Sequence, residues 1–93
     1  MKKITKLTNH ARVRLEQRTD LPPQFSSWTT YSDAAKREGK KLEDLTEKQR
    51  NFYLWKHGKP NQRAVRFFDN KCFIFAKKKN KYTLITVFKY TLR

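Results

Sequence analysis

The sequence predicts an α+β fold, in which N-terminal helices pack on a C-terminal antiparallel β-sheet. Residues that cap or end helices recur before residue 58, whereas after residue 62 polar and apolar residues alternate with the period of two that is typical of strands. Helices followed by a run of strands indicate the α+β class. For 93 residues we expect a single domain over 1–93, helical over about 8–58 and with its sheet over about 62–91.

The first helix is predicted to begin after Thr8 or Asn9, either of which can cap it, and to extend to about Arg18. Its buried stripe is expected to consist of Ala11 and Leu15. This stripe should pack the helix against the sheet.

The next segment is predicted to be largely irregular. Residues 22–30 contain consecutive prolines and several Ser and Thr residues, with Trp28 expected to pack inward. Ser32 can cap a short helix over 33–38, which Gly39 should end.

A further helix is predicted from a capping box. Thr46 and Gln49 have the spacing of that motif, and the helix should run to about His57, next to Gly58. Three aromatic residues are expected to bury part of it: Phe52, Tyr53 and Trp55.

Three strands are predicted in the last third of the chain, over 63–68, 71–77 and 82–90. Asp69 and Asn70 tolerate positive φ and should form a tight hairpin turn between the first two. We therefore expect a three-strand antiparallel meander, alone or within a larger sheet.

The chain is strongly basic. Its 23 Lys and Arg residues outnumber 8 Asp and Glu residues, which gives a formal net charge of +15. The charge is uneven, because residues 56–93 contain eleven basic and one acidic side chain, a net charge of +10. This excess predicts a polyanionic partner: nucleic acid first, ahead of an anionic membrane or an acidic protein.

Cysteine and histidine content limits the chemistry. Cys72 is the only cysteine, so no internal disulfide can form, and its strand-like surroundings predict a buried thiol. One Cys and two His residues do not supply a structural zinc site, so no metal or other cofactor is expected. Without a long apolar run or a signal peptide, we expect no membrane partner and a cytoplasmic location.

Two short motifs at opposite ends of the chain indicate a function. His10, Arg14 and Arg18 are spaced four residues apart, which places them on one helical face. The last strand contains Thr86-Val87-Phe88, in which Thr86 presents a hydroxyl. A histidine, fixed cations and a hydroxyl on a basic chain predict chemistry on a phosphodiester, above all that of RNA.

These motifs resemble those of the RelE/barnase/EndoU-like superfamily of small ribonucleases and toxins. The closer similarity is to a phage and bacterial subgroup with an N-terminal His-Ala-x-x-Arg-x-x-x-Arg helix and a C-terminal Thr-Val-aromatic strand. It covers about residues 5–18 and 63–89, and the segment 24–60 matches no pattern of that group. The resemblance implies a RelE/barnase-like fold and metal-independent RNA cleavage by a toxin or phage-encoded effector, with a cognate antitoxin as a second partner.

Metal-free cleavage by the 2′-OH needs a base, an acid and cations around the phosphate. His10 is the candidate base or acid, because histidine alone titrates near neutral pH when unperturbed. Arg14 and Arg66 can bind the phosphate, and the resemblance gives Thr86 a hydrogen bond to it. The structural alternatives stay open: a histidine that only hydrogen-bonds at a helix start, salt-bridged or outward-facing arginines, and a threonine that merely suits a strand.

Other residues are predicted to bind nucleic acid without reacting. Arg18 and Arg63 are candidate phosphate contacts, and Tyr82 and Tyr90 could stack bases or simply pack in the core. A basic turn could grip the backbone or only be solvated: Lys77, Lys78, Lys79 and Lys81.

Three functions are therefore compatible with the sequence. The leading hypothesis is a small metal-independent endoribonuclease. The alternative is a non-catalytic nucleic-acid-binding or host-inhibitory protein on the same scaffold. The third is a basic accessory protein that binds an acidic partner.

Overall fold

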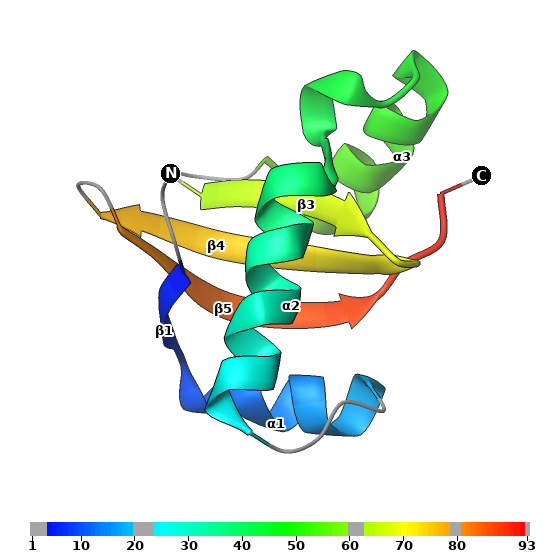
Figure 1. Ribbon diagram of the computed structural model, residues 1–93. Coiled ribbons are helices and arrows are strands. Elements are labelled where there is room, and N and C mark those ends of the chain that lie inside the picture. Colours follow the sequence, from blue (N-terminus) through cyan, green and yellow to red (C-terminus); the bar gives the residue numbers. More distant parts are fainter. Residues whose placement is uncertain (1–3, 20–23, 60–62, 79–80, 93) are drawn as a thin grey trace.

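The computed structural model describes residues 4–19, 24–59, 63–78 and 81–92 (Figure 1). It confirms the α+β fold. In chain order the elements are β1 (Ile4–Leu7), α1 (Asn9–Arg18), α2 (Phe25–Glu38), β2 (Lys40–Lys41), the 3-10 turn η1 (Leu42–Asp44), α3 (Glu47–His57), β3 (Arg63–Phe68), β4 (Lys71–Lys78) and β5 (Lys81–Lys89).

The described strands form one five-stranded sheet with the order β1-β5-β4-β3-β2. Its centre is the predicted antiparallel meander of β3, β4 and β5. Asp69 and Asn70 form the predicted turn, with φ angles of 53° and 56°. Two short strands extend the sheet beyond the meander, because β2 pairs antiparallel with β3 and β1 pairs parallel with β5.

Helix α1 begins and packs as predicted. The Thr8 hydroxyl accepts a hydrogen bond from the Ala11 N–H at 3.0 Å and donates one to the Ile85 carbonyl at 2.8 Å. The Thr8 N–H also donates to the Leu84 carbonyl, at 3.1 Å. Ala11 and Leu15 are fully buried, so the start of α1 is fixed on β5 and its apolar stripe joins the core.

Helix α2 is longer than predicted. It is continuous from Phe25 to Glu38, so the irregular conformation expected for residues 25–30 is wrong, while residues 22–23 lie outside the described part. Residues 33–38 are helical as predicted, but they end this longer helix, and Ser32 lies inside it rather than capping it. Trp28, Ser32 and Ala35 form a buried stripe at helical spacing, and α2 crosses one face of the sheet (Figure 1). Burial of this stripe outweighs the low helix propensity of the Ser and Thr residues. The helix ends at Gly39, as predicted.

The two faces of the sheet carry separate clusters. The first-face cluster lies under α1 and α2, and its sheet residues include Phe73, Phe75, Leu84 and Val87. The second-face cluster lies under α3 and the C-terminal segment, and it includes Val65, Phe67, Cys72 and Tyr53. Cys72 is buried, as predicted.

A β-bulge in β5 changes which residues share a face. Ile74 pairs with Thr86 whereas Phe75 pairs with Leu84, so Ile85 is an extra residue on β5. Because side chains alternate along a strand, the bulge moves everything after it to the other face. Sequence alternation predicts one shared face for residues 82, 84, 86, 88 and 90, and this prediction is wrong.

Helix α3 has the predicted capping box, in which Thr46 and Gln49 exchange side-chain and backbone hydrogen bonds. Only Tyr53, which is 2 % exposed, buries its ring as expected. Phe52 and Trp55 are 52 % and 81 % exposed, because α3 contacts the sheet through the side that carries Tyr53.

Among the described helices, none combines the length and apolar character needed to cross a membrane.

Candidate nucleic-acid interface

The predicted residues of α1 lie at the surface. Arg14 Nε donates a hydrogen bond to His10 Nε2 at 3.4 Å, as the spacing of four residues allows. His10 and Arg18 are exposed and Arg14 is half-buried. The helix therefore presents an imidazole in contact with a guanidinium, with His10 Nε2 as the acceptor.

Thr86 does not join this pair. It lies in register with Ile74, and Ile74 with Val65, and both of these residues pack in the second-face cluster. Helix α1 packs in the first-face cluster instead. The two terminal motifs predict a shared basic cleft of His10, Arg14 and Thr86. This prediction is wrong, because the bulge at Ile85 turns Thr86 to the other face.

Arg66 lies on β3, two strands away from β5, on which the start of α1 is fixed, and it makes contacts of its own. It is 9 % exposed, and its guanidinium donates to the Lys36 carbonyl at 3.2 Å and to the Val65 carbonyl at 3.0 Å. Lys36 lies in the last turn of α2, whose terminal carbonyls lack helical partners. Arg66 thus fixes α2 on β3, a position that disagrees with the expected phosphate-binding role.

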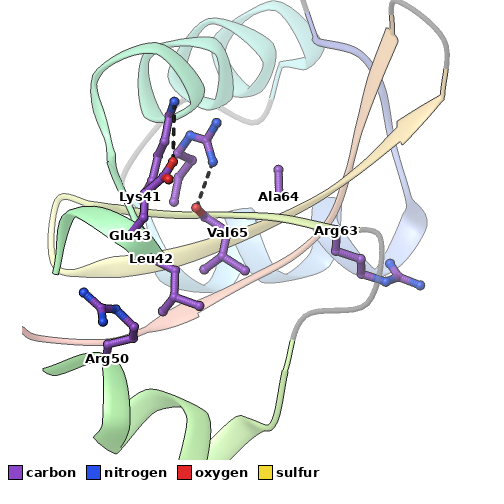
Figure 2. A pocket seen from close by; sticks show the side chains of 8 residues that line it. Lys41, Leu42, Glu43, Arg50, Arg63, Ala64 and Val65 are labelled. Carbon is purple, nitrogen blue, oxygen red and sulfur yellow. Dashed lines mark hydrogen bonds and ion pairs between the residues drawn. The ribbon is translucent and has the colours of Figure 1, made fainter. Parts of the chain in front are cut away.

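Arg63 contributes to an open groove at the edge of β3 (Figure 2). The groove has a volume of about 670 Å³, and its lining residues are Lys41, Leu42, Glu43, Arg50, Arg63, Ala64, Val65 and Arg66. Arg50 and Arg63 lie at opposite ends of the view, with Leu42 and Val65 between them. We call this the β3-edge groove.

The β3-edge groove is electropositive. Among the described residues that line it, four cationic side chains are opposed by one carboxylate, that of Glu43, which lies 3.9 Å from the Lys41 amine. Because β2 pairs only with residues 66 and 67, the edge of β3 beyond it is open in the described part of the chain. An extended anion could therefore lie along this edge between Arg50 and Arg63.

The sequence reasoning missed Lys41 and Arg50 as members of this site. Arg50 follows the capping residue Thr46 by four positions, so the capping box could have indicated its side of α3. The placement of Lys41 depends on the pairing of β2 with β3, and a strand of only two residues cannot be predicted from the sequence pattern.

The predicted base-stacking tyrosines separate. Tyr82 is 7 % exposed in the first-face cluster, with the Lys36 amine 4.2 Å from its ring centroid, so its ring is closed to a base. Tyr90 packs on the second face beside Tyr53 and stays partly accessible. For the basic turn, Lys79 lies outside the described residues, and the structure describes only the backbone of Lys77, Lys78 and Lys81.

Comparison of the chain with models of known families, with curated proteins and with solved structures finds no match. The similarity to RelE/barnase-like proteins therefore stays a prediction from the two terminal motifs. Within the described residues, His, Cys, Asp and Glu side chains nowhere gather in a group of three that could hold a metal ion.

Proposed function

We propose that this protein binds RNA through the phosphate backbone, and that the β3-edge groove is a principal contact. The observation that carries the proposal is the presence of Arg50 and Arg63 in the lining of one open groove, where Glu43 is the single acidic residue among the described lining residues. Guanidinium groups bind phosphate oxygens strongly. Arg50 Nη2 donates to the Leu45 carbonyl at 3.1 Å, so Arg50 would contact a phosphate through its remaining N–H groups, whereas Arg63 is exposed at the start of β3. A cytoplasmic location is part of this proposal.

Binding is preferred over cleavage as the main function because the predicted catalytic residues are dispersed. Thr86 and Arg66 have positions away from the His10–Arg14 pair, whereas the net charge of +10 over residues 56–93 needs no catalytic geometry to attract a polyanion. Contacts of this kind give affinity with little sequence selectivity.

The test is the salt dependence of RNA affinity. If about 4–6 phosphates are neutralised, log affinity should fall with log salt with a slope of about −3 to −4 for a single strand. Replacing Arg50 and Arg63 by Gln should make the slope shallower by roughly 1.4, because each lost phosphate contact removes about 0.7.

The matched control removes two arginines outside the groove. Arg12 contacts the Trp28 ring on the first face, and Arg37 pairs with Glu38 at 3.7 Å. The Arg12→Gln/Arg37→Gln variant has the same net charge as the groove variant and should keep most of the wild-type slope. An equal loss in both variants would contradict a localised groove, and a flat salt response of the wild type would contradict RNA binding altogether.

Metal-independent RNA cleavage is a second candidate, favoured by the 3.4 Å contact between His10 and Arg14 at the surface of α1. It pairs a proton acceptor with a phosphate-binding cation, which are two of the groups that 2′-OH attack requires. Incubation of RNA with the protein in EDTA should then leave 2′,3′-cyclic phosphate ends, and His10→Ala should slow this by about 10²- to 10⁴-fold. Intact RNA with the wild type would leave binding as the function.

A further inference from the structure

Helix α3 presents two large aromatic rings to solvent. Trp55 is 81 % exposed and Phe52 is 52 % exposed, and their ring centroids lie 6.0 Å apart with an interplanar angle of 44°. Single exposed apolar side chains are common on soluble proteins, but two adjacent aromatic rings beside a groove are typical of a binding surface.

The groove beside them is lined by cations. It has a volume of about 670 Å³ and lies between α3 and the segment after β5, with Lys48, Gln49, Phe52, Lys56, Lys89, Tyr90, Thr91 and Leu92 as its lining. Among the described residues that line it, the charged side chains are those of three lysines. We call this groove, together with Trp55, the α3 groove.

The helical spacing explains why rings and charges alternate. Lys48, Phe52 and Lys56 are four residues apart and therefore form one stripe along α3. Tyr53, on another side of α3, holds the helix on the sheet through edge-to-face contacts with Phe67 and Tyr90, at 5.4 Å and 5.8 Å between centroids. The stripe is thus presented outward by a helix that is itself fixed.

We propose that unpaired bases of a single-stranded nucleic acid stack on Phe52 and Trp55 while its phosphates contact Lys48, Lys56 and Lys89. This deepens the proposed function and rests on it. Every base has a ring face that an aromatic side chain can cover, and adjacent lysines can neutralise the phosphates between bases. In a duplex the base faces are already stacked, so a double-stranded ligand cannot use these rings.

The two grooves can act on the same strand. Arg50 lines the β3-edge groove, whereas Lys48 and Phe52 line the α3 groove, so α3 separates the two. A single strand that crosses α3 would exchange phosphate contacts on one side for base stacking on the other. The cationic linings of both grooves would attract any polyanion. The exposed rings of Phe52 and Trp55 favour a single strand over an acidic peptide, which would leave these rings without flat partners.

Tryptophan fluorescence tests the proposal directly, since the two tryptophans differ in exposure. Trp28 is 5 % exposed and Trp55 is 81 % exposed, so quenching by a ligand on the surface reports Trp55. The probes are an unstructured RNA oligonucleotide, the same sequence as a blunt duplex, and inorganic polyphosphate, which has charge but no bases. We expect quenching by the single strand alone. Trp55→Phe should abolish the quenching yet bind the single strand nearly as well as the wild type.

Affinity of the variants separates this inference from RNA binding as such. Trp55→Ala and Phe52→Ala should each weaken single-strand binding by about tenfold, with duplex binding and the salt slope nearly unchanged. Val13→Ala, which trims an apolar side chain that is 50 % exposed on α1, is the control and should change nothing.

Wild-type affinity for the single strand in both alanine variants would overturn the stacking proposal and leave the proposed function standing. The same conclusion follows if these variants instead abolish self-association of the protein, because the rings then serve a second copy of the chain. If the protein binds none of the three probes, both proposals are overturned.

Discussion

Replacing Arg66 by Ala should destabilise the protein rather than only weaken its binding to RNA. The Arg66 side chain is 9 % exposed and donates to two backbone carbonyls, those of Lys36 and Val65. Its β-carbon also lies close to Gly39, where an added methyl would come within 3.1 Å of it. The variant therefore loses a packed side chain and two charge-assisted hydrogen bonds at the point where α2 meets β3.

The expected loss in the free energy of unfolding is about 2–4 kcal/mol, since each hydrogen bond from a charged group contributes roughly 1.5–3 kcal/mol and water can solvate part of what is freed. For a chain of this size, 1 kcal/mol corresponds to about 4–8 °C in Tm, so the Tm should fall by roughly 8–32 °C. Thermal unfolding followed by circular dichroism measures this directly.

Arg63→Ala is the matched comparison, because Arg63 lies on the same strand and is exposed. Its Tm should stay close to that of the wild type, within about 0.5 kcal/mol of stability, while its affinity for RNA falls. Arg66→Lys should give an intermediate Tm, because lysine keeps the charge but not the fork that reaches two carbonyls. An Arg66→Ala variant with the wild-type Tm and weakened RNA binding would refute the structural role and restore Arg66 as a ligand contact.

Two further predictions concern pH and the hairpin turn. Burial raises the pKa of the Cys72 thiol to about 12 and also raises the pKa of the Tyr53 hydroxyl. The unfolded chain releases these protons at a lower pH than the folded chain does. The free energy of unfolding in urea should therefore fall as the pH rises above about 9. A constant free energy of unfolding up to pH 12 would contradict the burial of both groups. Asp69→Ala should lower the free energy of unfolding measured in urea by about 1–2 kcal/mol. It removes the acceptor of the Tyr31 hydroxyl, and it puts alanine, which lacks a polar side chain, at a position with positive φ. Asp69→Gly should cost less, and the reverse order would show that the turn conformation is unimportant.

Features that depend on neighbouring residues in the sequence were predictable. The capping box of Thr46 and Gln49 and the turn at Asp69 and Asn70 each use chemistry within four residues, and both are present at the predicted positions. The extent of α2 was not predictable in this way, because a run of Ser and Thr residues disfavours a helix locally. Its stripe of Trp28, Ser32 and Ala35 becomes favourable only when the sheet covers it.

The candidate site depended still more on tertiary structure. His10 and Arg14 meet as their spacing predicts, since both belong to one helix. Thr86 and Arg66 could be assigned to the same site only by assuming which way each strand residue faces. For Arg66 the missing information was the position of the end of α2, where the Lys36 carbonyl accepts a hydrogen bond from the Arg66 guanidinium.

For Thr86 the missing information was the bulge at Ile85, and the same bulge supports the alternative site. Unbroken alternation would put Phe88 and Tyr90 on the face of Leu84, under α1 and α2. With one extra residue they turn to the second face, where they pack near Tyr53 and help to hold α3 on the sheet. Because α3 contributes to both grooves, the backbone irregularity that separates Thr86 from His10 also positions the cations and aromatic rings that we propose bind RNA. The function expected from the terminal motifs and the function favoured by the structure thus depend in opposite ways on a single residue of β5.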